Sequence, residues 1–258
     1  MRPPRSSHAS RKRPGKVYLI GAGPGDPELI TLKGLQFLKE ADVVIYDHLV
    51  PHDLLQKAKR SARLISVGKK HGAHSMSQEA INELLFRKAA RGRKVARLKG
   101  GDPYVFGRGG EEILFLKARG IDAEVVPGVS SVIAVPALAG IPLTQRHLAM
   151  TVAVASGHVT EDNDPVPVPD ADTLVYVMCV SDLDKTVKQI LKKRSAGTPC
   201  AVIENGTTSK ERVIAGTLRD IVKKVRAAKV VPPAVFVVGK VVKLREKIFP
   251  QKPPVAGI

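Results

Sequence analysis

Short apolar runs alternate with segments of helical period along the first half of the chain. Five of these runs are expected to be β-strands, at 17–20, 43–46, 64–67, 95–98 and 123–126. Between them the pattern predicts helices over 27–41, from a capping box at 75–78 onward, and over 111–119. Strands separated by helices pair in parallel, so this half predicts a parallel sheet that is covered by helices.

A Pro-Gly pair at 127–128 interrupts the pattern and is the expected hinge before a second half. After a short helix to Ala139, strands are expected near 152–155, 174–178, 201–204, 213–215 and 234–238, with helices near 182–193 and 217–228. The sequence therefore predicts an α/β fold with two α/β domains, 16–126 and 127–250, and a ligand cleft between them. A basic disordered tail at 1–15 and a second tail at 251–258 are expected outside the domains.

Composition then narrows the classes of function. No apolar run approaches the roughly 18 residues of a membrane-spanning helix, and two cysteines, Cys179 and Cys200, are too few for a disulfide framework. Both features favour a cytoplasmic protein with no membrane partner. The formal net charge of +18 indicates a polyanionic partner, which is nucleic acid, anionic lipid or a small polycarboxylate. Because Trp is absent and aromatic residues make up only 4%, nucleic acid is not the expected partner.

Two glycine-rich turns follow predicted strands in the first half. The first is GAGPG at 21–25, and the second is GGDP at 100–103. Glycines allow positive φ and a close approach of backbone to ligand, and parallel sheets bind ligands at the carboxyl ends of their strands. A dinucleotide-binding turn is one interpretation, with Asp47 as the ribose ligand, but Asp26 stands where the third glycine of that motif belongs.

Six segments, in this order, resemble the uroporphyrinogen-III C-methyltransferases of the tetrapyrrole methylase superfamily. They are GAGPGDPELITLKG at 21–34, ADVVIYD at 41–47, VGKK at 67–70, GGDPYVFGRGGEE at 100–112, VPGVSS at 126–131 and AGIPLTQR at 139–146. The resemblance covers the chain from about Lys16 to about Lys243. It implies two α/β domains with S-adenosylmethionine (the methyl-donating co-substrate) in their cleft, in a homodimer. The implied reaction is two methyl transfers to uroporphyrinogen III, giving precorrin-2 for sirohaem or cobalamin biosynthesis.

The resemblance also implies roles for single residues. Asp47 matches the proton acceptor of these enzymes and Lys69 matches the proton donor. Contacts with S-adenosylmethionine are implied for Pro24, Gly100, Gly101, Asp102, Val105, Ser130, Ser131, Met178 and Gly206. The chain departs from the family pattern at Ser130, where Thr is usual, and at Glu211, where Gln is frequent. Cations around the cleft suit a polycarboxylate substrate, and the candidates are Arg108, Lys70 and Arg146.

Other functions stay open at this point. A ribosomal-RNA methyltransferase of the same superfamily is favoured by the charge, but such enzymes lack the Tyr46-Asp47 pair and the 100–112 motif. A corrin-ring methyltransferase shares the fold and the methyl donor. A non-catalytic nucleic-acid-binding module and a nicotinamide dehydrogenase are the remaining alternatives. No metal is expected, because His71 and His74 are loosely spaced and have no Cys or paired acid nearby in sequence.

Overall fold

The computed structural model describes residues 13–68, 76–158 and 165–250. Within them the chain forms two compact α/β units, and each unit holds one five-stranded sheet. The first unit includes the chain up to Ala22 and Ile30–Gly128, and the second includes Gly23–Leu29 and the chain from Val129 onward. The predicted fold class, α/β with two sheets, is confirmed. Most of the predicted N-terminal tail and all of 251–258 lie outside the described residues.

The sheet of the first unit is wholly parallel, with the strand order β3-β2-β4-β1-β5. Its strands are β1 (Lys16–Gly21), β2 (Val43–Tyr46), β3 (Arg63–Ser66), β4 (Val95–Lys99) and β5 (Asp122–Val126). Because every connection returns the chain to the same end of the sheet, all five carboxyl ends lie along one edge. This is the edge at which the sequence predicts the glycine turns and Asp47.

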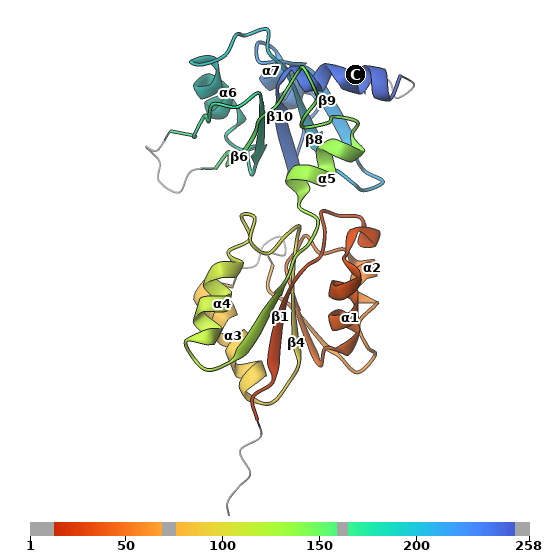
Figure 1. Cartoon of the computed structure of the whole chain (residues 1–258), viewed down its shortest axis with the longest axis vertical. Coiled ribbons are helices and arrows are strands. Elements are labelled where there is room, and N and C mark those ends of the chain that lie inside the picture. Colours follow the sequence, from red (N-terminus) through yellow and green to blue (C-terminus); the bar gives the residue numbers. More distant parts are fainter. Residues whose placement is uncertain (1–12, 69–75, 159–164, 251–258) are drawn as a thin grey trace, which may run out of the picture. The chain divides into compact units, whose positions relative to one another are not determined.

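Helices cover both faces of this sheet. The helices α1 (Leu32–Glu40) and α2 (His52–Leu55) cover one face, while α3 (Gln78–Ala90) and α4 (Gly109–Lys117) cover the other (Figure 1). Side chains alternate between the faces with a period of two. On β1, Leu19 therefore packs in the α3–α4 core and Ile20 packs in the α1–α2 core.

The segment predicted as one helix over 27–41 is divided in the structure. Its first part is a 3₁₀ turn, η1 (Pro27–Leu29), with Oδ1 of Asp26 accepting a hydrogen bond from the N–H of Glu28 at 2.8 Å. The α-helix starts anew at Leu32, because Oγ1 of Thr31 accepts a hydrogen bond from the N–H of Gly34 at 3.1 Å. Leu32, the first residue of this helix, is 88% exposed.

The cap of α3 also differs slightly from the expected capping box. Ser77 is the N-cap, and its Oγ accepts a hydrogen bond from the N–H of Ala80 at 3.2 Å. The predicted first residue of the box, Ser75, lies outside the described residues. The helix itself is confirmed, with Ile81 and Leu85 buried on its inner side.

The second sheet is mixed, with the strand order β6-β7-β10-β8-β9. Among the strands that the structure describes, its one parallel pair is β6 (Val152–Ser156) and β7 (Thr173–Val177). The strands β10 (Ala234–Val238), β8 (Pro199–Glu204) and β9 (Arg212–Thr217) pair antiparallel. A loop of 205–211 connects β8 directly to β9, which a parallel crossover does not allow.

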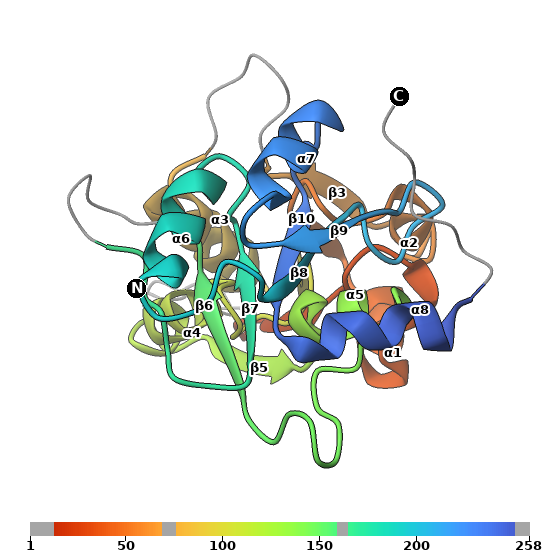
Figure 2. The same cartoon turned by 90° about the horizontal axis from the view of Figure 1, so that it is seen from above.

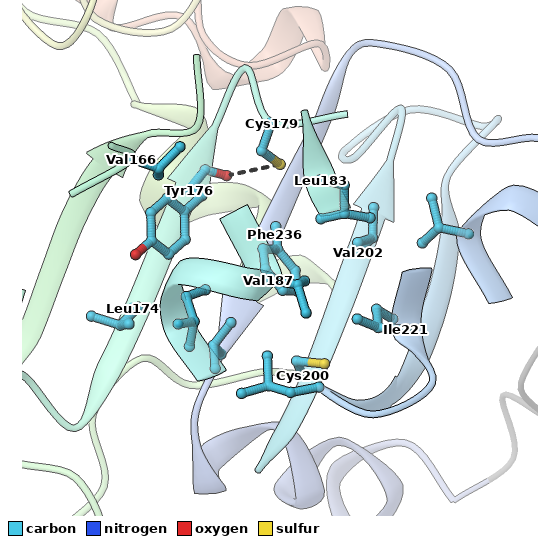
Figure 3. Packing of buried hydrophobic residues seen from close by; sticks show 14 of the residues in the cluster. Val166, Leu174, Tyr176, Cys179, Leu183, Val187, Cys200, Val202, Ile221 and Phe236 are labelled. Carbon is cyan, nitrogen blue, oxygen red and sulfur yellow. Dashed lines mark hydrogen bonds between the residues drawn. The ribbon is translucent and has the colours of Figure 1, made fainter. Parts of the chain in front are cut away.

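Helices also cover both faces of the second sheet (Figure 2). One face carries α6 (Leu183–Leu191) and α7 (Ile221–Ala227), and the other carries α5 (Ser131–Leu138), η2 (Lys240–Lys243) and α8 (Leu244–Ile248). Figure 3 shows the first of these cores, where Phe236 lies beside Val187 and Val202. None of the described helices is both long and apolar enough to cross a membrane.

Both cysteines belong to this core of the second unit (Figure 3). Cys179 and Cys200 are fully buried and unpaired. Burial raises the pKa of each thiol to about 12. Since the thiolate is the reactive form, both cysteines act as small apolar side chains of the core.

Candidate active site

The loops that follow the strands meet along the carboxyl edge of the first sheet. The N–H of Ala22, after β1, donates to the carbonyl of Lys99 at 2.8 Å, and the N–H of Asp47, after β2, donates to the carbonyl of Leu98 at 3.2 Å. A Cβ placed on Gly100 would lie 3.2 Å from Cβ of Leu49. The turn that starts at Gly100 and the loop that starts at Asp47 are therefore neighbours in this unit.

Three glycines from distant parts of the sequence pack backbone against backbone at this edge. A Cβ on Gly21 would lie 2.5 Å from Cα of Gly128, and a Cβ on Gly128 would lie 2.4 Å from the carbonyl oxygen of Gly101. Gly101 also has a φ of +66°, which disfavours any other residue there. The two glycine turns found in the sequence thus serve first to bring the ends of β1, β4 and β5 together.

The side chain of Asp102 also connects the segments that hold Gly101 and Gly128. Its Oδ1 accepts a hydrogen bond from the N–H of Tyr104 at 2.8 Å, and its Oδ2 accepts one from the N–H of Gly128 at 2.9 Å. Both carboxylate oxygens are therefore engaged with backbone donors. Asp102 therefore fixes the conformation of the turn, and it affects ligand binding indirectly, by shaping the turn.

The loop after Asp102 combines exposed apolar side chains with strained backbone. Tyr104, Val105 and Phe106 are 57%, 39% and 47% exposed. Phe106 and Arg108 have φ values of +54° and +56°, which non-glycine residues rarely adopt outside functional or tightly constrained segments. These exposed apolar side chains beside a polar turn are available to contact an organic ligand.

Arg108, predicted to bind substrate, already has a carboxylate partner. Its Nε and Nη2 donate to the two oxygens of Glu111 at 2.8 and 2.7 Å. This two-pronged contact raises the pKa of Arg108 and lowers that of Glu111. The guanidinium of Arg108 is thus paired on the surface. To bind a substrate carboxylate, it must either contact Glu111 and the substrate together or break its contact with Glu111.

Asp47 belongs to a network of charged side chains that is buried on the α3–α4 side. Nη2 of Arg97 lies 2.5 Å from Oδ1 of Asp47, and Nζ of Lys99 lies 3.9 Å from Oδ2. Arg97, Lys99 and Glu112 have side chains that are 2%, 4% and 0% exposed, while that of Asp47 is 32% exposed. Only the Asp47 end of the network therefore meets solvent.

Glu112 of α4 holds the inner end of this network. Its Oε1 accepts hydrogen bonds from Nε of Arg97 at 3.1 Å, Nζ of Lys99 at 3.0 Å and Nε2 of Gln78 at 3.2 Å. Burial, followed by the charge of Arg97, lowers the pKa of Lys99 below its ordinary value. Two cations and two carboxylates thus compensate one another in a setting from which water is largely excluded.

Sequence reasoning missed Arg97, Lys99 and Glu112, although the chain carries a signal for them. The segment 95–99 is fully buried, and its charged residues, Arg97 and Lys99, stand at alternate positions on one face. Charges inside a buried strand require partners. An acidic partner is available nearby in sequence, because the next helix starts with two consecutive acids, Glu111 and Glu112.

In the second unit, the first glycine loop packs against the loop between β8 and β9. The N–H of Asp26 donates to Oγ1 of Thr207 at 3.1 Å, and a Cβ on Gly25 would lie 3.3 Å from the carbonyl oxygen of Gly206. Pro24 directly precedes Gly25 in this loop. Glu211, the departure from the family pattern, supports this loop because its Oε2 accepts a hydrogen bond from the N–H of Thr207 at 3.0 Å.

The start of α5 and the end of β7 contribute the other predicted contacts of this unit. Oγ of Ser130 caps α5 by accepting a hydrogen bond from the N–H of Val132 at 3.4 Å, and Ser131 is the first helical residue. A Cβ on Gly206 would lie 2.4 Å from Cγ1 of Val135, so the β8–β9 loop touches this helix. Met178 directly follows β7, is 51% exposed and has a φ of +55°, which argues against a core-filling role.

Predicted donor contacts thus occur in both units. The first unit holds Gly100, Gly101, Asp102 and Val105, and the second holds Pro24, Ser130, Ser131, Met178 and Gly206. Arg146 is exposed in the segment between α5 and β6. Lys69, Lys70, His71 and His74 lie outside the described residues. Among the residues that are described, no cluster of three His, Cys, Asp or Glu side chains is suited to hold a metal ion.

Comparison with known sequences gives a consistent family. The sequence model described as Tetrapyrrole (Corrin/Porphyrin) Methylases matches residues 16–222. The chain is 55% identical over 234 residues to the uroporphyrinogen-III C-methyltransferase of Methanocaldococcus jannaschii, covering 88% of this chain and 97% of that protein. It is 45% identical over 240 residues to the siroheme synthase of Pseudomonas fluorescens, covering 91% of this chain. The chain spans only about half of that second protein, 52% of its length.

Solved structures with the same fold include proteins of the same kind as these relatives. The uroporphyrin-III C-methyltransferase from Thermus thermophilus superposes with a TM-score of 0.80 at 42% identity, covering 92% of this chain and 98% of that one. A second structure of the Thermus protein, complexed with S-adenyl homocysteine, gives a TM-score of 0.74 at 42% identity, with coverage of 89% and 94%.

Proposed function

The chain belongs to the tetrapyrrole (corrin/porphyrin) methylase family, and on that premise we propose that it is an S-adenosylmethionine-dependent C-methyltransferase acting on uroporphyrinogen III. It would add two methyl groups, giving precorrin-2 for sirohaem or cobalamin biosynthesis. The observation that carries this proposal is the carboxylate of Asp47. It is one-third exposed at the end of a buried strand, beside the turn that starts at Gly100.

The residues that would hold the methyl donor include two sharp turns of the backbone. Both Gly101 and Met178 have positive φ, and the side chain of Met178 is 51% exposed. The predicted contacts Pro24, Ser130 and Gly206 belong to the second unit, where the loop that holds Gly25 and Asp26 contacts the loop between β8 and β9.

S-adenosylmethionine supplies an electrophilic methyl group on a sulfonium. A pyrrole carbon of the porphyrinogen attacks it, the carbon–sulfur bond breaks, and the positive charge passes to the ring system. The ring then loses a proton, and Asp47 is the base that accepts it. Its carboxylate also stabilises the cationic ring before the proton leaves, because it meets solvent on one side only. Lys69 is the proposed proton donor.

The charge of the protein fits the proposed substrate, which carries a carboxylate on each side chain. A net charge of +18 steers a polyanion to the protein. Arg146 is exposed and suits direct binding of a carboxylate, whereas Arg108 would have to release Glu111 first. Lys70 completes the proposed set.

The proposal also includes the assembly and the domain limits. We infer a homodimer that uses no metal, with the catalytic carboxylate in domain 16–126 and further donor contacts in domain 127–250. Size-exclusion chromatography with light scattering tests the first point, since a monomeric active enzyme contradicts it.

One experiment tests the reaction itself. The protein is incubated anaerobically with S-adenosylmethionine and uroporphyrinogen III, and the product is analysed by mass spectrometry. A mass increase of two methyl groups is expected. Transfer only to a later, already methylated corrin precursor would favour a corrin-ring methyltransferase, and transfer only to ribosomal RNA would favour the RNA enzyme of the same superfamily.

A further inference from the structure

Arg97 lies between the solvent-exposed carboxylate of Asp47 and the fully buried carboxylate of Glu112. Its Nη2 is 2.5 Å from Oδ1 of Asp47, and its Nε is 3.1 Å from Oε1 of Glu112. Nη1 donates to the carbonyl of Leu98 at 3.2 Å, and that same carbonyl accepts the N–H of Asp47. Arg97 therefore contacts both the side chain of Asp47 and the peptide group that receives the backbone of Asp47.

A buried guanidinium is expensive to maintain, and a well-packed apolar side chain at this position in a strand would serve stability as well or better. Both faces of β4 carry buried apolar residues: Val95 lies on the same face as Arg97, and Leu98 lies on the opposite face. The charge at Arg97 consequently indicates a task beyond packing. Its planar guanidinium meets Asp47, Glu112 and the carbonyl of Leu98 through three different nitrogens at once, which a single ammonium group does less well.

The two oxygens of Asp47 are in different situations. Oδ1 lies 2.5 Å from Nη2 of Arg97, whereas the nearest charged group to Oδ2 among the described residues is Nζ of Lys99 at 3.9 Å, beyond hydrogen-bond distance. Within the part of the chain that the structure describes, Oδ1 is therefore the anchored oxygen and Oδ2 has no cation at hydrogen-bond distance.

We propose that Arg97 is a positioning residue that anchors Oδ1 of Asp47 and presents Oδ2 as the oxygen that takes the proton. The inference rests on the proposed function, in which Asp47 accepts a proton from the methylated ring. The proton passes from a ring carbon to Oδ2, the electron pair of the broken C–H bond neutralises the ring cation, and Asp47 becomes the neutral acid. Glu112 keeps Arg97 in place from behind.

A double-mutant cycle on single-turnover methyl transfer tests this role. Arg97→Met removes the anchor with similar volume and should slow methyl transfer by about 10- to 100-fold, while calorimetry gives unchanged S-adenosylmethionine affinity. In an Asp47→Asn background the same change should slow transfer by less than about threefold, because the group it positions has already lost its function. If Arg97 had a merely structural role, Arg97→Met would slow methyl transfer by the same factor in both backgrounds.

Two further variants keep the test decisive if Arg97→Met does not fold. Arg97→Lys keeps the charge but loses the fork, and Glu112→Gln keeps the shape but loses the charge behind Arg97. Each should slow transfer by about 3- to 10-fold in the wild-type background and have almost no effect beside Asp47→Asn. Lys59→Met is the control, since Lys59 pairs at 2.6 Å with Asp42 at the opposite end of β2, and Asp42 is about as exposed as Asp47, at 29% against 32%.

The outcomes separate the inference from the proposed function. If the wild-type protein transfers no methyl group to uroporphyrinogen III, the proposed function is wrong and this role falls with it. If the wild type is active and Arg97→Met is equally active, or loses the same factor in both backgrounds, the positioning role alone is wrong. A loss of the same size in Lys59→Met also overturns it, because that pair is remote from Asp47.

Discussion

The N–H of Gly128 donates a hydrogen bond of 2.9 Å to Oδ2 of Asp102, across 26 positions of sequence. It connects the last residue of the first unit to the turn after β4. Because the other oxygen of Asp102 accepts the N–H of Tyr104, one carboxylate determines the path of two loops. The shape of the proposed donor site therefore depends on a side chain whose polar atoms are already occupied.

Replacing Asp102 by Asn should weaken both the fold and donor binding. The amide turns one acceptor into a donor, so one of the two backbone N–H groups loses its partner. We expect the free energy of unfolding to fall by about 1–3 kcal/mol and S-adenosylmethionine affinity to fall measurably in calorimetry. Asp172→Asn is the control, since Asp172 also accepts two backbone N–H groups, at 2.8 and 3.0 Å, in the second unit. Equal donor affinities in the two variants would contradict the prediction.

Replacing Gly21 by Ala should destabilise the first unit. Its new Cβ would meet Cα of Gly128 at 2.5 Å, and backbone cannot move aside as a flexible side chain does. We expect a loss of about 1–3 kcal/mol in urea unfolding. At Gly110, in α4, a Cβ would meet nothing within 4 Å. Gly110→Ala should therefore leave stability unchanged or raise it by up to about 1 kcal/mol, and a similar loss in both variants would refute the steric explanation.

Asp47→Asn should separate chemistry from binding. We expect turnover to fall by roughly 10²–10⁴-fold, the range for loss of a general base, with S-adenosylmethionine affinity nearly unchanged. The free energy of unfolding should drop by about 1–2 kcal/mol, because Arg97 loses one of two anionic partners but keeps Glu112. Single-turnover assays and calorimetry on one preparation measure both. If affinity collapses while turnover per bound donor is unchanged, Asp47 binds the donor and is not the base.

Asp42 should make stability depend on acid pH. The hydrogen bond from Lys59, followed by that from the N–H of Lys94, holds the pKa of Asp42 below its usual 3.8. Between the folded and unfolded values the unfolded chain binds more protons, so this contribution is complete above pH 3.8 and is lost as pH falls through the folded value. Unfolding free energies of Asp42→Asn and Lys59→Met should both vary less over this range than those of the wild type. A slope unchanged in both variants would rule out this pair as the cause.

Added salt should weaken binding of the substrate more than binding of the donor. Long-range attraction between a protein of net charge +18 and a polycarboxylate is screened beyond about 10 Å at 0.1 M salt. Titrations of both ligands from low to high ionic strength check this. If binding of the substrate and binding of the donor depend equally on salt, the positive charge serves general solubility and not recruitment of the substrate.

Local sequence signals predicted the strands and most helices, because each depends on periodicity and nearby caps. They failed at 27–41, where the side chains of Asp26 and Thr31 each accept a hydrogen bond from a backbone N–H and divide the segment into a 3₁₀ turn and an α-helix. They also gave no sign that β8 and β9 pair antiparallel. Strand pairing depends on contacts between distant residues, and alternation along a single strand does not reveal its neighbours.

The candidate site was only partly accessible from the sequence. Asp47 and the turn from Gly100 to Asp102 stand out as polar or glycine residues at strand ends. Arg97 was not found, because its function depends on Glu112 lying opposite it on another element. The contact of Asp26 with Thr207 likewise joins segments that no local pattern connects.

That last contact has a consequence for synthesis on the ribosome. The segment Gly23–Leu29 is made early, yet it packs in the second unit, and Asp26 leaves the ribosome 181 residues before Thr207. Domains generally fold as their residues emerge, but this segment gains its contact with the loop between β8 and β9 only after that loop has been made. A nascent chain that ends at Gly128 therefore holds all residues of the first unit together with a seven-residue segment, 23–29, whose partners in the second unit do not yet exist.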